Sequence, residues 1–118
     1  MSDIQNRADI QTLVDRFYER VKADVLLGPV FQHVDWPKHL PVMYDFWASM
    51  LLGEQSYRGN PFQRHLHLAI GPIHFERWLQ LFWQTVDANF AGEKAEEAKS
   101  RARSIAMVWQ HKMGLPVR

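Results

Sequence analysis

Cysteine is absent from this chain, and its absence removes several kinds of site at once. Without thiols the chain has no disulfide framework, no thiolate nucleophile, no iron–sulfur cluster and no cysteine-based zinc site. Haem attached covalently through a C-x-x-C-H motif is excluded for the same reason. A metal or cofactor would therefore depend on other ligands, and the six histidines are the best candidates.

An excess of one charge is also missing. The chain has 14 basic and 13 acidic residues and a formal net charge of +1. Proteins that bind nucleic acid or membrane surfaces electrostatically carry a basic excess, so we expect neither partner. The sequence has no apolar run long enough to span a membrane, and residues 1–7 contain no signal-peptide core. These absences predict a cytoplasmic protein.

The chain is rich in helical periodicity and in aromatic side chains. Apolar residues make up 47% and aromatic residues 13% of its 118 residues, so it should fold around a core. Because apolar residues recur at helical spacing and no strand-like alternation is present, we expect one all-α domain over residues 1–118. The aromatic content leaves two interpretations open: a small helical core, or a core that also covers a large flat ligand. The expected helices cover about residues 9–24, 37–52, 73–90 and 93–113, with a short additional helix that begins near Asn60 and Pro61.

His65 is the histidine best suited to bind a metal cofactor. It lies in a short segment bounded by glycine and proline, between two aromatic-rich helices. On a helix His65 and His67 would point about 200° apart, so they cannot share one metal ion. We expect His74 and His111 to be exposed, and His33 lies in a loop without a partner. No set of histidines has the spacing of a zinc site, whereas one axial ligand to a flat cofactor needs only one imidazole.

Three other polar side chains lie on or near apolar helix faces. Tyr18 is on the apolar stripe of the first helix, where it is either a core tyrosine with a satisfied hydroxyl or a donor to a ligand. Trp78 raises the same question, because its indole N–H is a donor only. His39 either faces a pocket or caps the start of the second helix. An imidazole on one side of an apolar slot and N–H or O–H donors on the other would suit a haem iron.

With these residues in view, the chain resembles a truncated haemoglobin of the third group. Gly53 and Gly59 do not reproduce the glycine motifs of other groups, which agrees with this assignment. The resemblance covers almost the whole chain and rests on Phe17-Tyr18, Gly28-Pro29-Val30-Phe31, Trp36-Pro37-Lys38-His39-Leu40, Phe46-Trp47-Ala48-Ser49-Met50-Leu51-Leu52-Gly53, Tyr57-Arg58-Gly59-Asn60-Pro61, His65 and His74-Phe75-Glu76-Arg77-Trp78-Leu79.

The resemblance implies a fold, a cofactor and a set of site residues. The fold is a truncated globin, a two-on-two helical sandwich around haem b. His65 matches the proximal ligand of the haem iron, as in globins generally. The other matching positions are the distal hydrogen-bonding residues Tyr18 and Trp78, the distal histidine position His39, and the haem-pocket residues Phe31, Met43 and Trp47.

The implied function is the binding of dioxygen, nitric oxide or other small ligands. Two distal donors would slow oxygen release, which argues against bulk oxygen transport and favours sensing or ligand chemistry. Nitric oxide dioxygenation and peroxidase-like oxidation both fit, and the sequence does not choose between turnover and binding alone. A dioxygenase would need a separate reductase, because the chain has no flavin or dinucleotide motif. The alternative is a cofactor-free helical interaction module in which His65 is an exposed surface residue.

Overall fold

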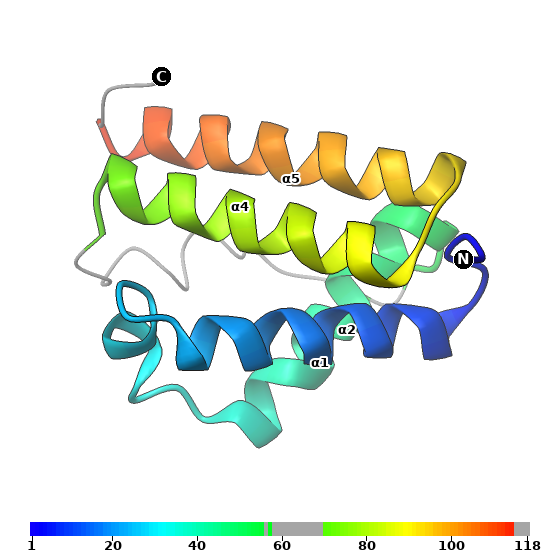
Figure 1. The fold of residues 1–118 in the computed structure, drawn as a ribbon, viewed down its shortest axis with the longest axis horizontal. Coiled ribbons are helices and arrows are strands. Elements are labelled where there is room, and N and C mark those ends of the chain that lie inside the picture. Colours follow the sequence, from blue (N-terminus) through cyan, green and yellow to red (C-terminus); the bar gives the residue numbers. More distant parts are fainter. Residues whose placement is uncertain (56, 58–69, 115–118) are drawn as a thin grey trace.

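The computed structural model describes residues 1–55, 57 and 70–114. Within these residues every regular element is helical, which confirms the all-α prediction. None of the described helices is both long and apolar enough to cross a membrane. In chain order the elements are α1 (Arg7–Ala23), the short 3-10 helix η1 (Gly28–Phe31), α2 (Trp36–Leu52), α4 (Pro72–Asn89) and α5 (Glu93–Lys112) (Figure 1).

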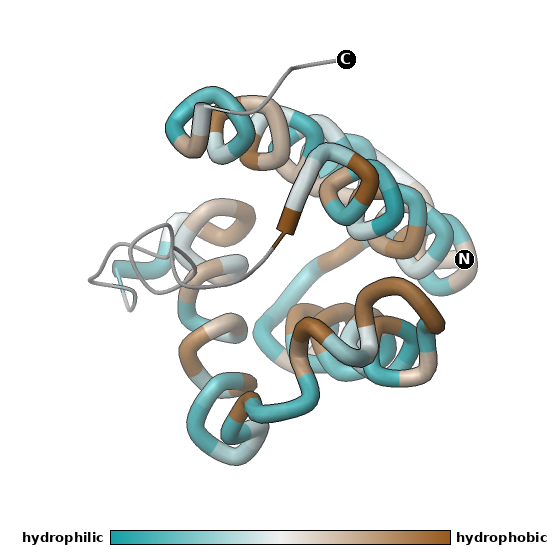
Figure 2. Tube along the Cα trace, turned by 90° about the vertical axis from the view of Figure 1, so that its left-hand side faces the viewer, coloured by the Kyte–Doolittle hydropathy of each residue, from teal (hydrophilic) through white to brown (hydrophobic). Residues whose placement is uncertain are grey.

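The helices form two layers. In one layer α4 and α5 run antiparallel, and in the other α1 packs against α2 and η1 (Figure 1). The two layers meet mainly where α1 contacts α4. Viewed from the side, the α4–α5 pair lies above α1, and α2 rises beside them (Figure 2). The predicted apolar face of α1 is buried at this junction, where the ring of Phe17 lies 5.2 Å from that of Phe82.

Local signals in the sequence explain where α1 and α2 begin and end. The Asn6 side chain accepts a hydrogen bond from the Asp9 N–H at 3.0 Å, so α1 starts two residues earlier than expected. The left-handed residue Gly53 (φ 71°) ends α2, as its sequence predicted. Pro41 lies inside α2, because the helix already begins at Trp36. The carbonyl of Pro37 therefore lacks the usual amide donor four residues later.

The chain's N-terminal segment caps α5. The Asp3 carboxylate accepts hydrogen bonds from the backbone N–H groups of Lys94 (2.9 Å) and Ala95 (2.8 Å). Gly92, which joins α4 to α5, has φ 140°, and a Cβ there would lie 2.5 Å from the Asp3 carboxyl carbon. Glycine is therefore needed both for the backbone conformation and for the close approach of the carboxylate. Asp3 thus acts as an N-cap supplied from the far end of the sequence.

Removing this cap should destabilise the fold. Partial burial acts to raise the pKa of Asp3, but its hydrogen bonds from Lys94 and Ala95 outweigh that effect and hold the pKa below 3.8. Because the pKa of Asp3 is lower in the folded state, its contribution to the free energy of unfolding is fully present above pH 3.8. This contribution is lost as the pH falls through the pKa of the folded state. At pH 7 we expect Asp3→Ala to reduce the free energy of unfolding by about 0.5–2 kcal/mol. Urea unfolding measured from pH 7 down to pH 3 checks both the loss of stability at pH 7 and its decrease in acid.

Asp87→Ala provides the control for this experiment. It removes the same charge from an exposed side chain that pairs with Lys99 at 2.8 Å. Exposed ion pairs contribute little, so this variant should lose less than about 0.5 kcal/mol. Equal losses in the two variants, or a loss for Asp3→Ala that does not shrink in acid, would contradict the capping role.

Candidate functional site

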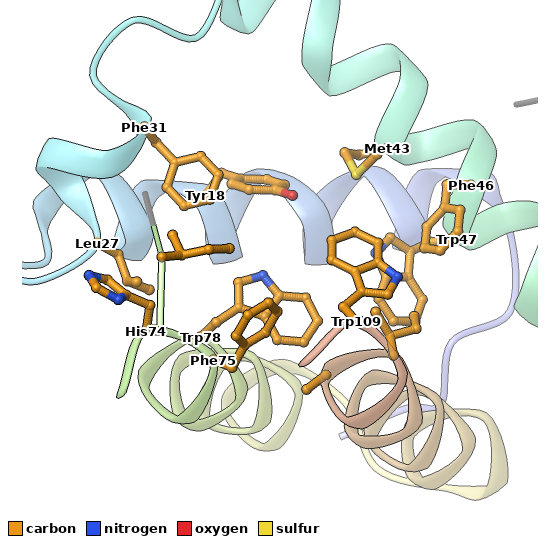
Figure 3. A pocket seen from close by; sticks show the side chains of 13 residues that line it. Tyr18, Leu27, Phe31, Met43, Phe46, Trp47, His74, Phe75, Trp78 and Trp109 are labelled. Carbon is orange, nitrogen blue, oxygen red and sulfur yellow. The ribbon is translucent and has the colours of Figure 1, made fainter. Parts of the chain in front are cut away.

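A cavity opens between the two helix layers. The empty space inside it, together with the part open to solvent, is about 680 Å³. Tyr18, Phe31 and Met43 lie along one side, and Phe75, Trp78 and Trp109 lie along the other (Figure 3). The lining residues are Tyr18, Leu27, Phe31, Met43, Phe46, Trp47, Ile70, His74, Phe75, Trp78, Ile105, Ala106 and Trp109.

Tyr18 brings a polar group to this apolar lining. It lies on the buried stripe of α1 and is 5% exposed. Among the described residues, no hydrogen bond to its hydroxyl is formed, although a buried phenol normally has a partner. Burial raises the pKa of Tyr18 above its usual value of 10.0, so the hydroxyl keeps its proton at neutral pH. The cavity therefore contains a protonated donor that the described protein groups leave available.

Trp78 lies on the opposite side from Tyr18 and belongs to a stack of rings. Its ring is 5.8 Å from that of Phe82 with an interplanar angle of 14°. Phe82 in turn stacks on Trp47 at 4.8 Å and 20°. Because Phe82 is fully buried, this stack fixes Trp78 and Trp47 as rigid parts of the cavity lining. The indole nitrogen of Trp78 lies on the side of its ring that faces Tyr18 (Figure 3).

His39 has a different position from the other distal candidates. Its ring packs edge-on against Tyr18 at 5.3 Å and against Trp36 at 5.6 Å. It is not among the described residues that line the cavity. Its backbone N–H donates to the Asp35 carbonyl at 2.8 Å in the first turn of α2. His39 therefore contacts the site through Tyr18, and a direct role at a ligand stays a prediction.

The structure corrects the expectation that His74 is exposed. This side chain is half-buried and lines the cavity. Its Nδ1 accepts a hydrogen bond from the Gly71 N–H at 2.9 Å at the start of α4. That contact turns the ring back over the first turn of the helix, a direction that the helical periodicity does not reveal. His65, the expected axial ligand, lies outside the described residues.

Five of the residues that line the cavity were predicted from the sequence to belong to the site, and the others were not. Tyr18, Phe31, Met43, Trp47 and Trp78 do come together, as the resemblance implied. Ile105, Ala106 and Trp109 of α5 also line the cavity, and Ile105 and Trp109 are half-buried there. The lining residues with no earlier functional assignment are Leu27, Phe46, Ile70, His74, Phe75, Ile105, Ala106 and Trp109.

Comparison with known proteins identifies the family. The model of the bacterial-like globin family matches residues 3–113, nearly the whole chain. The chain is a bacterial-like globin. The globin is 36% identical over 113 residues to the group 3 truncated hemoglobin ctb of Campylobacter jejuni, covering 90% of this chain and 89% of the relative. A crystal structure of group III truncated hemoglobin from Campylobacter jejuni superposes with a TM-score of 0.86 at 35% identity, covering 96% and 95% of the two chains.

The cavity of this globin fits the cofactor that the family implies. Globins bind small gaseous ligands such as oxygen at haem, a large flat ring system with an apolar body. The cavity offers flat aromatic side chains on two opposing sides and few polar groups, as Figure 3 shows. The Tyr18 hydroxyl without a described protein partner is the kind of group that a ligand inside the cavity would satisfy. The described residues therefore agree with a haem site, and the match to truncated haemoglobins confirms the fold class.

Proposed function

We propose that this globin holds haem b through His65 and carries out chemistry on, or senses, a small ligand bound there. The haem would supply an iron atom that binds diatomic ligands reversibly. Phe31, Met43 and Trp47 would contact the flat face of the ring from the α1–α2 layer. Tyr18 and Trp78 would donate hydrogen bonds to the ligand, and His39 would support the same side of the site. Family membership supports haem over the cofactor-free alternative.

The buried Tyr18 hydroxyl is the observation that carries this proposal. It is protonated, it faces an apolar cavity, and no described protein group accepts its hydrogen bond. A hydrogen bond to a ligand with partial negative charge contributes about 1.5–3 kcal/mol. That free energy corresponds to about 10- to 150-fold slower escape of the ligand for each donor. With Trp78 as a second donor, dioxygen would be held tightly, and such retention suits reaction or sensing better than bulk transport.

Two reactions match a cavity with distal donors. Nitric oxide dioxygenation consumes nitric oxide, dioxygen and an electron to give nitrate, and a separate reductase would supply the electron. Peroxidase-like oxidation consumes a peroxide and electrons from a reducing substrate. In both, Tyr18 and Trp78 would orient the oxygen ligand and stabilise the negative charge that develops on it.

Rapid mixing distinguishes turnover from storage. The reduced, oxygen-loaded globin is mixed with nitric oxide, and absorbance and nitrate are followed. We expect the oxygen-loaded spectrum to disappear far faster than oxygen dissociates spontaneously, with one nitrate formed per haem. A reaction limited by oxygen release would contradict dioxygenation. The oxidised globin mixed with hydrogen peroxide and a phenolic reductant tests the second reaction in the same way.

A further inference from the structure

We infer that His74 binds a carboxylate of the haem through its Nε2–H group and so positions the ring in the cavity. This inference rests on the proposed haem binding and assigns a partner to the polar edge of the cofactor. His74 lies with Leu27 at one end of the cavity, away from Phe46 and Trp47 at the other end (Figure 3). A flat ring inserted between the helix layers would bring one of its edges to this end.

The hydrogen bond at Gly71 determines which atom of His74 is available. Because Nδ1 accepts the Gly71 N–H at 2.9 Å, the neutral ring carries its proton on Nε2. In this tautomer Nε2 is a donor and has no lone pair for iron. Iron ligation by His74 Nε2 would require the other tautomer and the loss of the Gly71 contact. His74 is therefore suited to a carboxylate and not to the metal, which separates its role from that proposed for His65.

The charge of the lining points to the same partner. Haem has two ionised carboxylates on an otherwise apolar ring, and each is stabilised by a donor or by water. The described lining contains no lysine and no arginine, and the Nε2–H of His74 is the donor that the ring offers while Nδ1 accepts from Gly71. His74 is also half-buried, so a hydrogen bond to it would be less screened than one on the open surface. A charge-assisted bond at this position would fix the ring within its plane.

A comparison of two proteins, each with two forms of haem, distinguishes this inference from a purely structural capping role of His74. His74→Leu and the wild type are each loaded with natural haem or with haem dimethyl ester, which lacks both ionised carboxylates. The rate of haem loss to an excess of apomyoglobin is then measured by absorbance. We expect His74→Leu to lose natural haem about 10-fold faster or more, but to change the loss of the ester less than about 2-fold. Equal acceleration for both haems would overturn the inference, because it would show only a loss of the helix cap.

A second variant keeps the helix cap intact. Glutamate at the third helical position is the usual capping-box residue, so His74→Glu can still accept the Gly71 N–H. It cannot donate to a carboxylate, and its charge repels one, so natural haem should leave at least as fast as from His74→Leu. Wild-type rates for natural haem in His74→Glu would also overturn the inference. A wild type that shows no haem band with either compound would overturn the proposed function, and this inference with it.

Discussion

Replacing His65 with glycine should abolish the five-coordinate haem spectrum of this globin. His65 is the proposed axial ligand, and the alternatives are poor. His74 carries its ring proton on Nε2 when neutral, and His39 packs against Tyr18 without lining the cavity. Deleting the imidazole therefore leaves the iron without a protein ligand, although the apolar cavity can still hold the ring. Absorbance spectra of the reduced protein, recorded with and without added haem, provide the measurement.

Two controls sharpen this experiment. Added imidazole should enter the space left in His65→Gly and restore a histidine-like spectrum, which shows that the fold is intact. His67→Gly removes a neighbouring histidine expected to point about 200° away on a helix, so it should keep the wild-type spectrum. Unchanged ligation in His65→Gly, or lost ligation in His67→Gly, would show that another side chain binds the iron.

Oxygen should dissociate about 10- to 150-fold faster from Tyr18→Phe than from the wild type. The substitution removes the hydroxyl and retains the ring, so the packing against Phe17 and Phe31 should persist. Because burial raises the pKa of Tyr18, the wild-type donor stays protonated, and its effect should not vary between pH 6 and 9. The dissociation rate is measured by stopped-flow displacement of oxygen with carbon monoxide at several pH values.

Tyr44→Phe is the matched control for Tyr18. The Tyr44 hydroxyl donates to the Asp15 carboxylate, and burial together with this contact raises the pKa of Tyr44 to about 12. Tyr44 does not line the cavity, so its loss should affect stability and leave the oxygen dissociation rate within about 2-fold of the wild type. Equal rates in Tyr18→Phe and the wild type would instead make Tyr18 a core residue without a role at the ligand.

The helices could be predicted from the sequence because their signals are local. The apolar stripe of α1 and the glycine that ends α2 each lie within a few residues of the feature they determine. The Asp3 cap on α5 could not be found in this way. The hydrogen bond that Asp3 accepts from the Lys94 N–H joins residues 91 positions apart, and no local pattern marks that pairing. A contact of this kind depends on how the finished layers approach each other.

The residues of the cavity also differ in how far the sequence predicted them. The resemblance brought Tyr18 and Trp78 together correctly, because a family pattern already encodes which distant positions meet. Periodicity alone placed His74 on an exposed first turn. Its orientation depends on the Gly71 N–H and on the space left between the two helix layers, neither of which a helical wheel contains. The His39 ring packs edge-on against the Tyr18 ring, a contact between distant positions that the sequence does not reveal, and its role at a ligand stays a prediction.

We propose above all that the cavity between the two helix layers holds one haem. A titration of the globin with hemin tests this most directly. Trp47, Trp78 and Trp109 line this cavity, so haem bound there should quench much of the tryptophan fluorescence. We expect a Soret band and a loss of tryptophan fluorescence that both saturate at one hemin per chain. The fluorescence should fall strongly from the first additions, because quenching depends on distance and the haem would lie beside these rings. Hemin binding that does not saturate, or a Soret band that grows while the tryptophan fluorescence stays unchanged, would contradict it.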